Sequence, residues 1–191
     1  MSMSQKALLA ILFAMIGLNT WSLYTVRALH ADEYLRAPEI HSHELSMLGR
    51  LKLVDGNRSI DPEKSGTRIS LLYIFSPYDC PQSIDELGEL ESLQREQPSL
   101  DIKAIALYES ADEVEQTRQK FRLTFPIASD PKATAKELLR PPQTPWKVLM
   151  ESSNQHVLLQ DGPSITTEEK KAFHNRVVYL LRAFQHDHPA S

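Results

Sequence analysis

The single cysteine, Cys80, is the residue with the clearest chemistry. It follows a nearly continuous apolar run, Ile69–Phe75, and precedes a stretch with helical periodicity. A thiol at the start of a helix faces unpaired backbone N–H groups and the positive end of the helix dipole, which lower its pKa. Cys80 is therefore predicted to be a nucleophile that attacks a disulfide or is oxidised to sulfenic acid.

Three side chains are predicted to influence this thiol. Ser83 lies one helical turn after Cys80, where it could donate a hydrogen bond to the thiolate, and Lys147 could approach it in the fold. Asp79 opposes thiolate formation because like charges repel. Since the chain holds one cysteine, it cannot close a disulfide of its own, and a mixed disulfide must be opened by an external thiol.

Composition excludes several other classes of protein. The chain has 191 residues, a net charge of -4, 41% apolar and 24% charged residues, which suits one globular domain with a tail and gives no footprint for nucleic acid. Without a glycine-rich phosphate loop or nucleotide fingerprint, no cofactor is expected. The pairs His41-x-His43 and His186-x-His188 have ligand-like spacing, but both lie toward the chain ends, where solvated residues are common, so no metal is expected. Soft-metal binding by Cys80 and a histidine is the alternative.

The elements that must position Cys80 follow from the apolar pattern. Strands are expected over 51–54, 69–75, 101–108, 146–150 and 156–160, a short extended piece over 125–127, and helices over 80–97, 110–121, 130–139 and from 166 onward. Strands that alternate with helices predict a parallel sheet, to which the closing hairpin adds antiparallel strands.

Three sequence signals predict where helices begin. Ser110 with Glu113, and Thr166 with Glu169, have the spacing of a capping box. Asp130-Pro131 reads as a capping aspartate followed by a proline in the first helical position.

The N-terminal segment has the pattern of a membrane anchor or signal sequence. Residues 7–26, a stretch of 20, carry no charge, and about 20 residues of helix cross a bilayer. The favoured interpretation is an uncleaved anchor with the domain on the exported, periplasmic or extracytoplasmic side; the alternatives are a cleaved signal and a buried N-terminal helix. The expected organisation is a tail at 1–6, the anchor, a connector at 27–48, a domain at 49–185 and a tail at 186–191.

Three motifs together resemble the thioredoxin-like superfamily. Tyr73–Ser83 is similar to its active-site turn, Phe125–Asp130 to an inserted stretch of the redoxin branch, and Gln143–Val148 to its Thr-Pro segment. That branch includes membrane-tethered thiol-disulfide oxidoreductases and the alkyl hydroperoxide reductase and thiol-specific antioxidant proteins. The resemblance covers about residues 50–184. It implies an α/β thioredoxin-like fold with a central mixed sheet flanked by helices.

The resemblance also implies the site. Pro145 is expected to be cis and to face the cysteine, and the substrate groove is expected to be formed by four residues, Tyr78, Pro81, Thr144 and Pro145. Ser83 stands where the family has its resolving cysteine, so a self-contained dithiol cycle is excluded. Tyr73 and Pro77 replace the proline and the threonine or serine of the peroxiredoxin signature, which argues against a peroxide pocket.

These observations predict a membrane-anchored protein whose Cys80, assisted by Ser83, carries out thiol-disulfide exchange or thiol oxidation. The expected partners are a protein thiol or disulfide or a low-molecular-weight thiol, and the membrane through residues 7–26. The competing interpretation is a non-catalytic module that keeps the fold and binds a partner protein.

Overall fold

A computed structural model describes residue 15 and residues 69–78, 82–153 and 156–187. The chain divides into two units, Met1–Ala37 and Pro38–Ser191. The second unit holds these elements in chain order: β1 (Ile69–Phe75), α3 (Gln82–Glu96), β2 (Leu100–Leu107), α4 (Ala111–Phe121), β3 (Ile127–Asp130), α5 (Thr134–Leu139), β4 (Trp146–Glu151), β5 (Val157–Asp161) and α6 (Thr167–Asp187).

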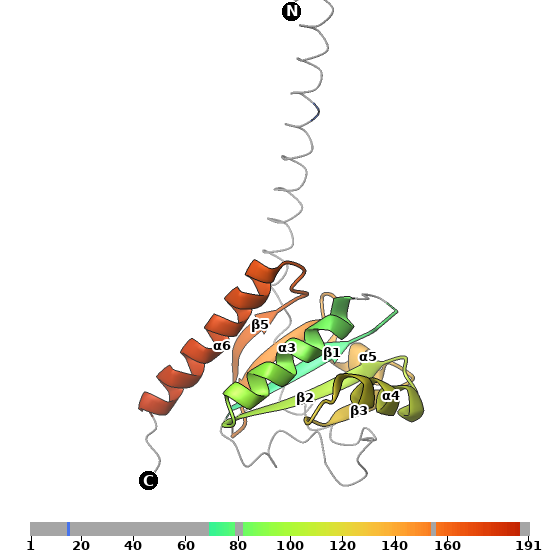
Figure 1. The fold of residues 1–191 in the computed structure, drawn as a ribbon, viewed down its shortest axis with the longest axis horizontal. Helices are drawn as coiled ribbons and strands as arrows, with labels where there is room; N and C mark the ends of the chain where they lie inside the picture. Colours follow the sequence, from blue (N-terminus) through green and yellow to red (C-terminus); the bar gives the residue numbers. More distant parts are fainter. Residues whose placement is uncertain (1–14, 16–68, 79–81, 154–155, 188–191) are drawn as a thin grey trace, which may run out of the picture. The chain divides into compact units, whose positions relative to one another are not determined.

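The strands form one mixed sheet in the order β3-β2-β1-β4-β5 (Figure 1). β1 pairs in parallel with β2, and β2 with β3, whereas β4 runs antiparallel to both β1 and β5. The predicted combination of a parallel part and a closing hairpin is thereby confirmed.

β1 lies at the centre of the sheet because its sequence is apolar on both faces. All seven of its residues are buried. Leu71, Tyr73 and Phe75 join one core cluster, whereas Leu72 and Ile74 join a second cluster on the opposite face. A nearly continuous apolar run is typical of a strand that is covered on both sides.

α3 and α6 supply apolar stripes to the first cluster. Leu87, Leu90 and Leu93 come from α3, and α6 contributes Phe173, Val177 and Leu181. On the other face, Ala135 and Leu139 of α5 join the second cluster. The helical periodicity of both long helices therefore predicts correctly which of their faces are buried.

Both predicted capping boxes are present. Ser110 and Glu113 exchange hydrogen bonds at the start of α4, and the Glu169 N–H donates to Thr166 Oγ1 while Glu169 Oε2 accepts from the Thr166 N–H. The prediction for Asp130-Pro131 is wrong, because β3 continues through Asp130 and α5 begins at Thr134. Asp130 still satisfies the helix start, since its carboxylate accepts from the N–H groups of Thr134 and Ala135.

Several sequence predictions concern residues outside the described ranges: the anchor at 7–26 apart from Met15, the connector at 27–48, the strand at 51–54, and the residues Cys80 and Pro81. Within the ranges that are described, no helix has the length and apolar character needed to cross a membrane. α6 extends to Asp187, slightly beyond the predicted domain end at residue 185.

Candidate functional site

The candidate site lies at the edge of the sheet where β1 ends. Because β4 is antiparallel to β1, with Trp146 opposite Ile74, the segment Thr144–Pro145 comes to the same edge as the residues that follow β1. The Thr144–Pro145 peptide bond is cis, as the resemblance implied. Tyr78, with 67% of its surface exposed, follows β1 at this edge. The described chain continues with α3 after Cys80 and Pro81.

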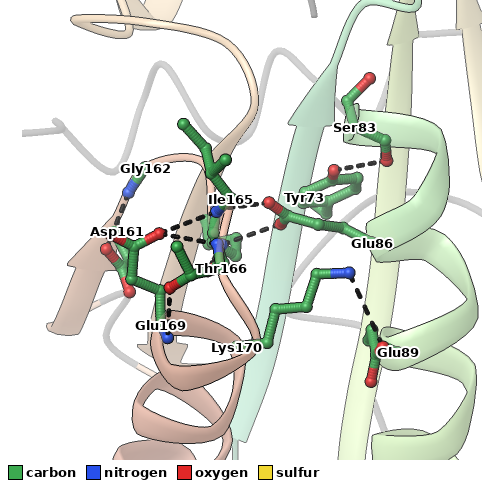
Figure 2. A network of polar contacts seen from close by, with 12 residues as sticks. Tyr73, Ser83, Glu86, Glu89, Asp161, Gly162, Ile165, Thr166, Glu169 and Lys170 are labelled. Carbon is green, nitrogen blue, oxygen red and sulfur yellow. Dashed lines mark hydrogen bonds and ion pairs between the residues drawn. The ribbon is translucent and has the colours of Figure 1, made fainter. Parts of the chain in front are cut away.

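Ser83 is held inside the domain rather than at its surface. Its side chain is fully buried, and its hydroxyl donates to the Ser76 carbonyl over 3.2 Å. Its own carbonyl accepts a 2.8 Å hydrogen bond from the Tyr73 hydroxyl (Figure 2). A serine hydroxyl has one hydrogen to donate, so a hydrogen bond from Ser83 to the Cys80 thiolate would have to replace the one to Ser76. The hydrogen bond from Ser83 to Cys80 stays a prediction.

One row of residues across the sheet carries three polar anchors. Tyr73 of β1 is opposite Lys147 of β4, which is opposite Asp161 of β5. Tyr73 binds the N-terminal turn of α3, Lys147 binds α3 and the loop before α6, and Asp161 binds that loop and α6. The row therefore connects the sheet to the N-terminal part of α3, to the loop before α6 and, through Arg176, to α6 itself.

Lys147 is directed into the core. Only 1% of its side chain is exposed, and its Nζ lies 2.8 Å from Glu86 Oε2 and 2.8 Å from Ser164 Oγ. The same Nζ lies 4.6 Å from the centroid of the Phe173 ring, which is cation–π distance. Its charge is thus taken up by α3 and α6, and the structure provides no support for its predicted approach to Cys80.

Glu86 completes this arrangement, and the sequence reasoning missed it. Its Oε1 accepts from the Ser164 N–H over 2.5 Å, and Oε2 binds Lys147. Burial raises the pKa of Glu86, against the opposing pull of Lys147, Ser164 and Lys170. A usable signal was present, because Lys147 is the one cation in the apolar strand Trp146–Met150. Buried charges are nearly always paired, so that lysine required an acid from elsewhere in the fold.

A small cavity of about 30 Å³ adjoins the ion pair between α3 and α6. Glu86, Lys147 and Ser164 line it together with Lys170 and His174 of α6, and three apolar residues, Leu90, Leu93 and Phe173, also line it. A cavity of this volume is large enough for one water molecule.

Glu109, after β2, is a second acid that the sequence reasoning missed. It is 6% exposed, and its Oε2 has no hydrogen-bond partner in the part of the chain that the structure describes. Burial, followed by the charge of Glu113, raises the pKa of Glu109. Glu113 itself accepts hydrogen bonds from Ser110 and Tyr78, and the bonds from Ser110 are the main cause of its lowered pKa. Tyr78 thus connects the segment after β1 to α4.

Three features decide the fold class. They are the strand order of the sheet, the cis Thr144–Pro145 bond beside the end of β1, and helix α3, which follows β1 in the chain. The fold is thioredoxin-like. Among solved structures, a secreted disulfide oxidoreductase of Mycobacterium tuberculosis homologous to E. coli DsbE matches with a TM-score of 0.60 and 14% identity, over 73% of this chain and 99% of that one.

Two further solved structures have the same thioredoxin-like fold. A putative thiol:disulfide interchange protein DsbE from Chlorobium tepidum matches with a TM-score of 0.58 and 18% identity, over 68% of this chain and 89% of that one. StoA from Bacillus subtilis matches with a TM-score of 0.52 and 19% identity, over 66% and 93%. No family model matches the sequence. No curated protein sequence matches it either.

Proposed function

We propose that this thioredoxin-like protein carries out thiol-disulfide exchange through Cys80 and relies on an external thiol to complete the cycle. The observation that supports this most is positional. In the sequence, Cys80 stands between Tyr78, which follows β1, and Gln82, where α3 begins, and the cis Thr144–Pro145 bond precedes β4 at the end of the sheet where β1 ends. The similar solved structures include a protein named as a disulfide oxidoreductase and one named as a putative thiol:disulfide interchange protein.

The proposed cycle has two exchange steps. The Cys80 thiolate attacks one sulfur of a partner disulfide, so that a mixed disulfide forms and the other sulfur leaves as a thiolate that takes up a proton. A second thiolate, from a low-molecular-weight thiol or a partner protein, then attacks the mixed disulfide and releases Cys80. Electrons are conserved, because each cycle consumes one external disulfide and one external thiol and returns one thiol and one new external disulfide.

Activation of Cys80 would depend mainly on α3. This helix of 15 residues begins at Gln82, two positions after Cys80 in the sequence, so its unpaired N–H groups would favour the thiolate. Lys147 would contribute little, because its charge is compensated by Glu86 at 2.8 Å. The thiol is therefore expected to have a moderately lowered pKa.

We also propose that residues 7–26 anchor the chain in a membrane and that the domain lies on the exported side. The support is the uncharged stretch of 20 residues, which is long enough to span a bilayer.

Carbonate extraction of membranes tests this anchor. The full chain should remain in the pellet, whereas a variant in which Leu12 and Ile16 are replaced by Arg should appear in the supernatant.

The second candidate function is a binding module without catalysis. It is favoured by Ser83, which takes the place of a second thiol and is fully buried. A module of this kind would use the edge around Pro145 to hold a partner, and Cys80 would be dispensable.

The exchange reaction can be tested on the full chain in detergent micelles, with glutathione disulfide as the probe and mass spectrometry as the readout. We expect wild type and the control Ser92→Ala, an exposed position on α3, to gain one glutathione. Cys80→Ser should gain none, and Ser83→Cys should release it again as an internal disulfide forms. If wild type remains unmodified while its denatured form reacts, exchange is wrong and the binding module is the better account.

A further inference from the structure

The last helix, α6, differs in charge from the rest of the chain. From residue 170 to residue 186 it contains no acidic residue, and the lysines and arginines of this stretch are Lys170, Lys171, Arg176 and Arg182. The chain as a whole has a net charge of -4. The positive charge of α6 is therefore local, and its partners must come from other elements or from outside the protein.

Two of these cations are bound by acids of neighbouring elements. Lys170 Nζ lies 3.7 Å from Glu89 Oε1 of α3. Arg176 forms an ion pair with Asp161, the last residue of β5. In Figure 1, α6 covers β5 and lies beside α3. These two ion pairs therefore join α6 to the elements on which it packs.

The other two cations belong to a face of α6 that points away from the core. This outer face consists of Lys171, Asn175, Tyr179 and Arg182, which recur at spacings of four, four and three and so share one side of a helix. All four residues are exposed, and Tyr179 leaves 72% of its surface accessible. The opposite side of the helix is buried in the first core cluster through Phe173, Val177 and Leu181.

The polar groups of this outer face are available to a partner. Within the described ranges, neither Lys171 nor Arg182 forms an ion pair, and the Tyr179 hydroxyl has no hydrogen bond. An exposed tyrosine between basic side chains has the composition of a surface that meets lipid headgroups. Tyrosine rings collect at the membrane–water interface, and lysines and arginines are attracted to anionic lipids.

We propose that the outer face of α6 docks on a membrane surface that contains anionic phospholipids. Lys171 and Arg182 bind headgroup phosphates, and the Tyr179 ring lies in the headgroup layer beside them. This inference rests on the proposed anchor at residues 7–26 and not on the chemistry of Cys80. It adds to the anchor a second contact with the bilayer, made by the folded domain.

A weak contact is sufficient for this role because the anchor already holds the chain at the membrane. Each lysine or arginine close to an anionic bilayer strengthens binding about fivefold, so Lys171 and Arg182 together contribute about 30-fold. Such a factor would not retain a free protein. For a tethered domain the contact is intramolecular, and the effective concentration of lipid is high. A soluble acidic protein would need a much larger interface, so the membrane is the better-matched partner.

The test uses the full chain in nanodiscs made of phosphatidylcholine alone or of an equal mixture with phosphatidylglycerol. Acetic anhydride modifies exposed lysines, and mass spectrometry compares Lys171 with Lys132, an exposed lysine before α5. We expect Lys171 to react about fivefold more slowly in the anionic discs, whereas Lys132 should react equally in both. High salt should remove the protection of Lys171, because it screens exposed charges.

Variants show whether the outer face itself is responsible. Arg182→Glu should abolish the protection of Lys171 in anionic discs, and Arg182→Lys, which keeps the charge, should retain it. Arg140→Glu makes the same change of charge at an exposed position after α5 and serves as the matched control, which should also retain it.

Two results would overturn the inference in distinguishable ways. If the chain co-elutes with both kinds of disc but Lys171 reacts equally in them, the docking is wrong while the anchor stands, and an acidic protein becomes the better partner for this face. If the chain elutes without either disc, the proposed anchor is wrong, and this inference with it.

Discussion

Glu86 and Lys147 form an ion pair of 2.8 Å in which 4% and 1% of the side chains are exposed. The pair joins α3 to β4, and therefore connects the helix that follows Cys80 with the strand that follows Pro145. Each charge has further partners: the Ser164 N–H donates to Glu86, and Lys147 Nζ lies at hydrogen-bond distance from Ser164 Oγ and at cation–π distance from the Phe173 ring. A buried pair of this kind is seldom retained for stability alone, since desolvation offsets most of the attraction.

Removal of one partner from this pair should be costly. Glu86→Gln leaves Lys147 as an uncompensated buried cation and should reduce the free energy of unfolding by about 3 kcal/mol. Lys147→Met should have a similar effect, whereas the double variant should lose much less than the sum. Chemical denaturation of the four proteins measures the coupling. The control is Glu89→Gln, whose side chain is 61% exposed and 3.7 Å from Lys170, with an expected loss below about 1 kcal/mol. Additive losses would contradict the account.

The hydrogen bond from Tyr73 to the Ser83 carbonyl should stabilise the start of α3. Tyr73→Phe removes a fully buried hydroxyl and leaves that carbonyl without its 2.8 Å donor. We expect a loss of about 1–2 kcal/mol in the free energy of unfolding. Tyr179→Phe, at an exposed position of α6, should change it by less than about 0.5 kcal/mol. Equal effects of the two substitutions would show that the buried bond contributes nothing.

Glu109 predicts a pH dependence of stability. Because its pKa is raised above the usual 4.5, the folded state holds the proton more tightly than the unfolded state. The stability that the protonated Glu109 carboxyl contributes is fully present below that usual pKa and is lost as pH rises through the pKa of the folded state. Glu109→Gln should therefore have the same free energy of unfolding as wild type near pH 4 and a higher one at pH 8. Denaturation at several pH values, with the exposed Glu168→Gln as control, checks this; a variant that is less stable at pH 8 would contradict it.

Arg122 lies in a left-handed conformation, with φ 52° and ψ 44°, at the end of α4. Glycine adopts this region without a steric cost, so Arg122→Gly should stabilise the domain by up to about 1 kcal/mol. The same substitution at the exposed helical position Gln116 should destabilise it by about 1 kcal/mol. Thermal unfolding should show that Arg122→Gly is more stable than wild type and that Gln116→Gly is less stable. A loss of stability in both variants would contradict the interpretation.

Local patterns were sufficient for most of the elements. The apolar run Ile69–Phe75 predicts β1 to the residue, and both capping boxes predict where α4 and α6 begin. Local patterns gave a wrong prediction at Asp130. Pairing with Leu107 extends β3 through this residue, although its local sequence favours the start of a helix. Pairing between strands is a long-range property, which explains why a local motif misjudged it.

The site was predictable only in part, for the same reason. The cis bond was expected because the Thr144–Pro145 segment resembles the Thr-Pro segment of thioredoxin-like proteins, and the structure confirms it. The bond between Lys147 and Glu86 joins residues 61 positions apart, and the bond between Ser164 and Glu86 spans 78. No periodicity within one helix or strand specifies such partners, although a lone cation in a buried strand shows that one must exist.

The central claim is that Cys80 is a working nucleophile, and the pH dependence of its alkylation tests this most directly. Because the full chain holds no other cysteine, its reaction with iodoacetamide reports this thiol alone. We expect the folded protein to react with an apparent pKa clearly below about 8.5, the value of a free thiol, and the denatured protein to react near that value. A folded thiol that is inert, or that titrates at or above about 8.5, would contradict the account.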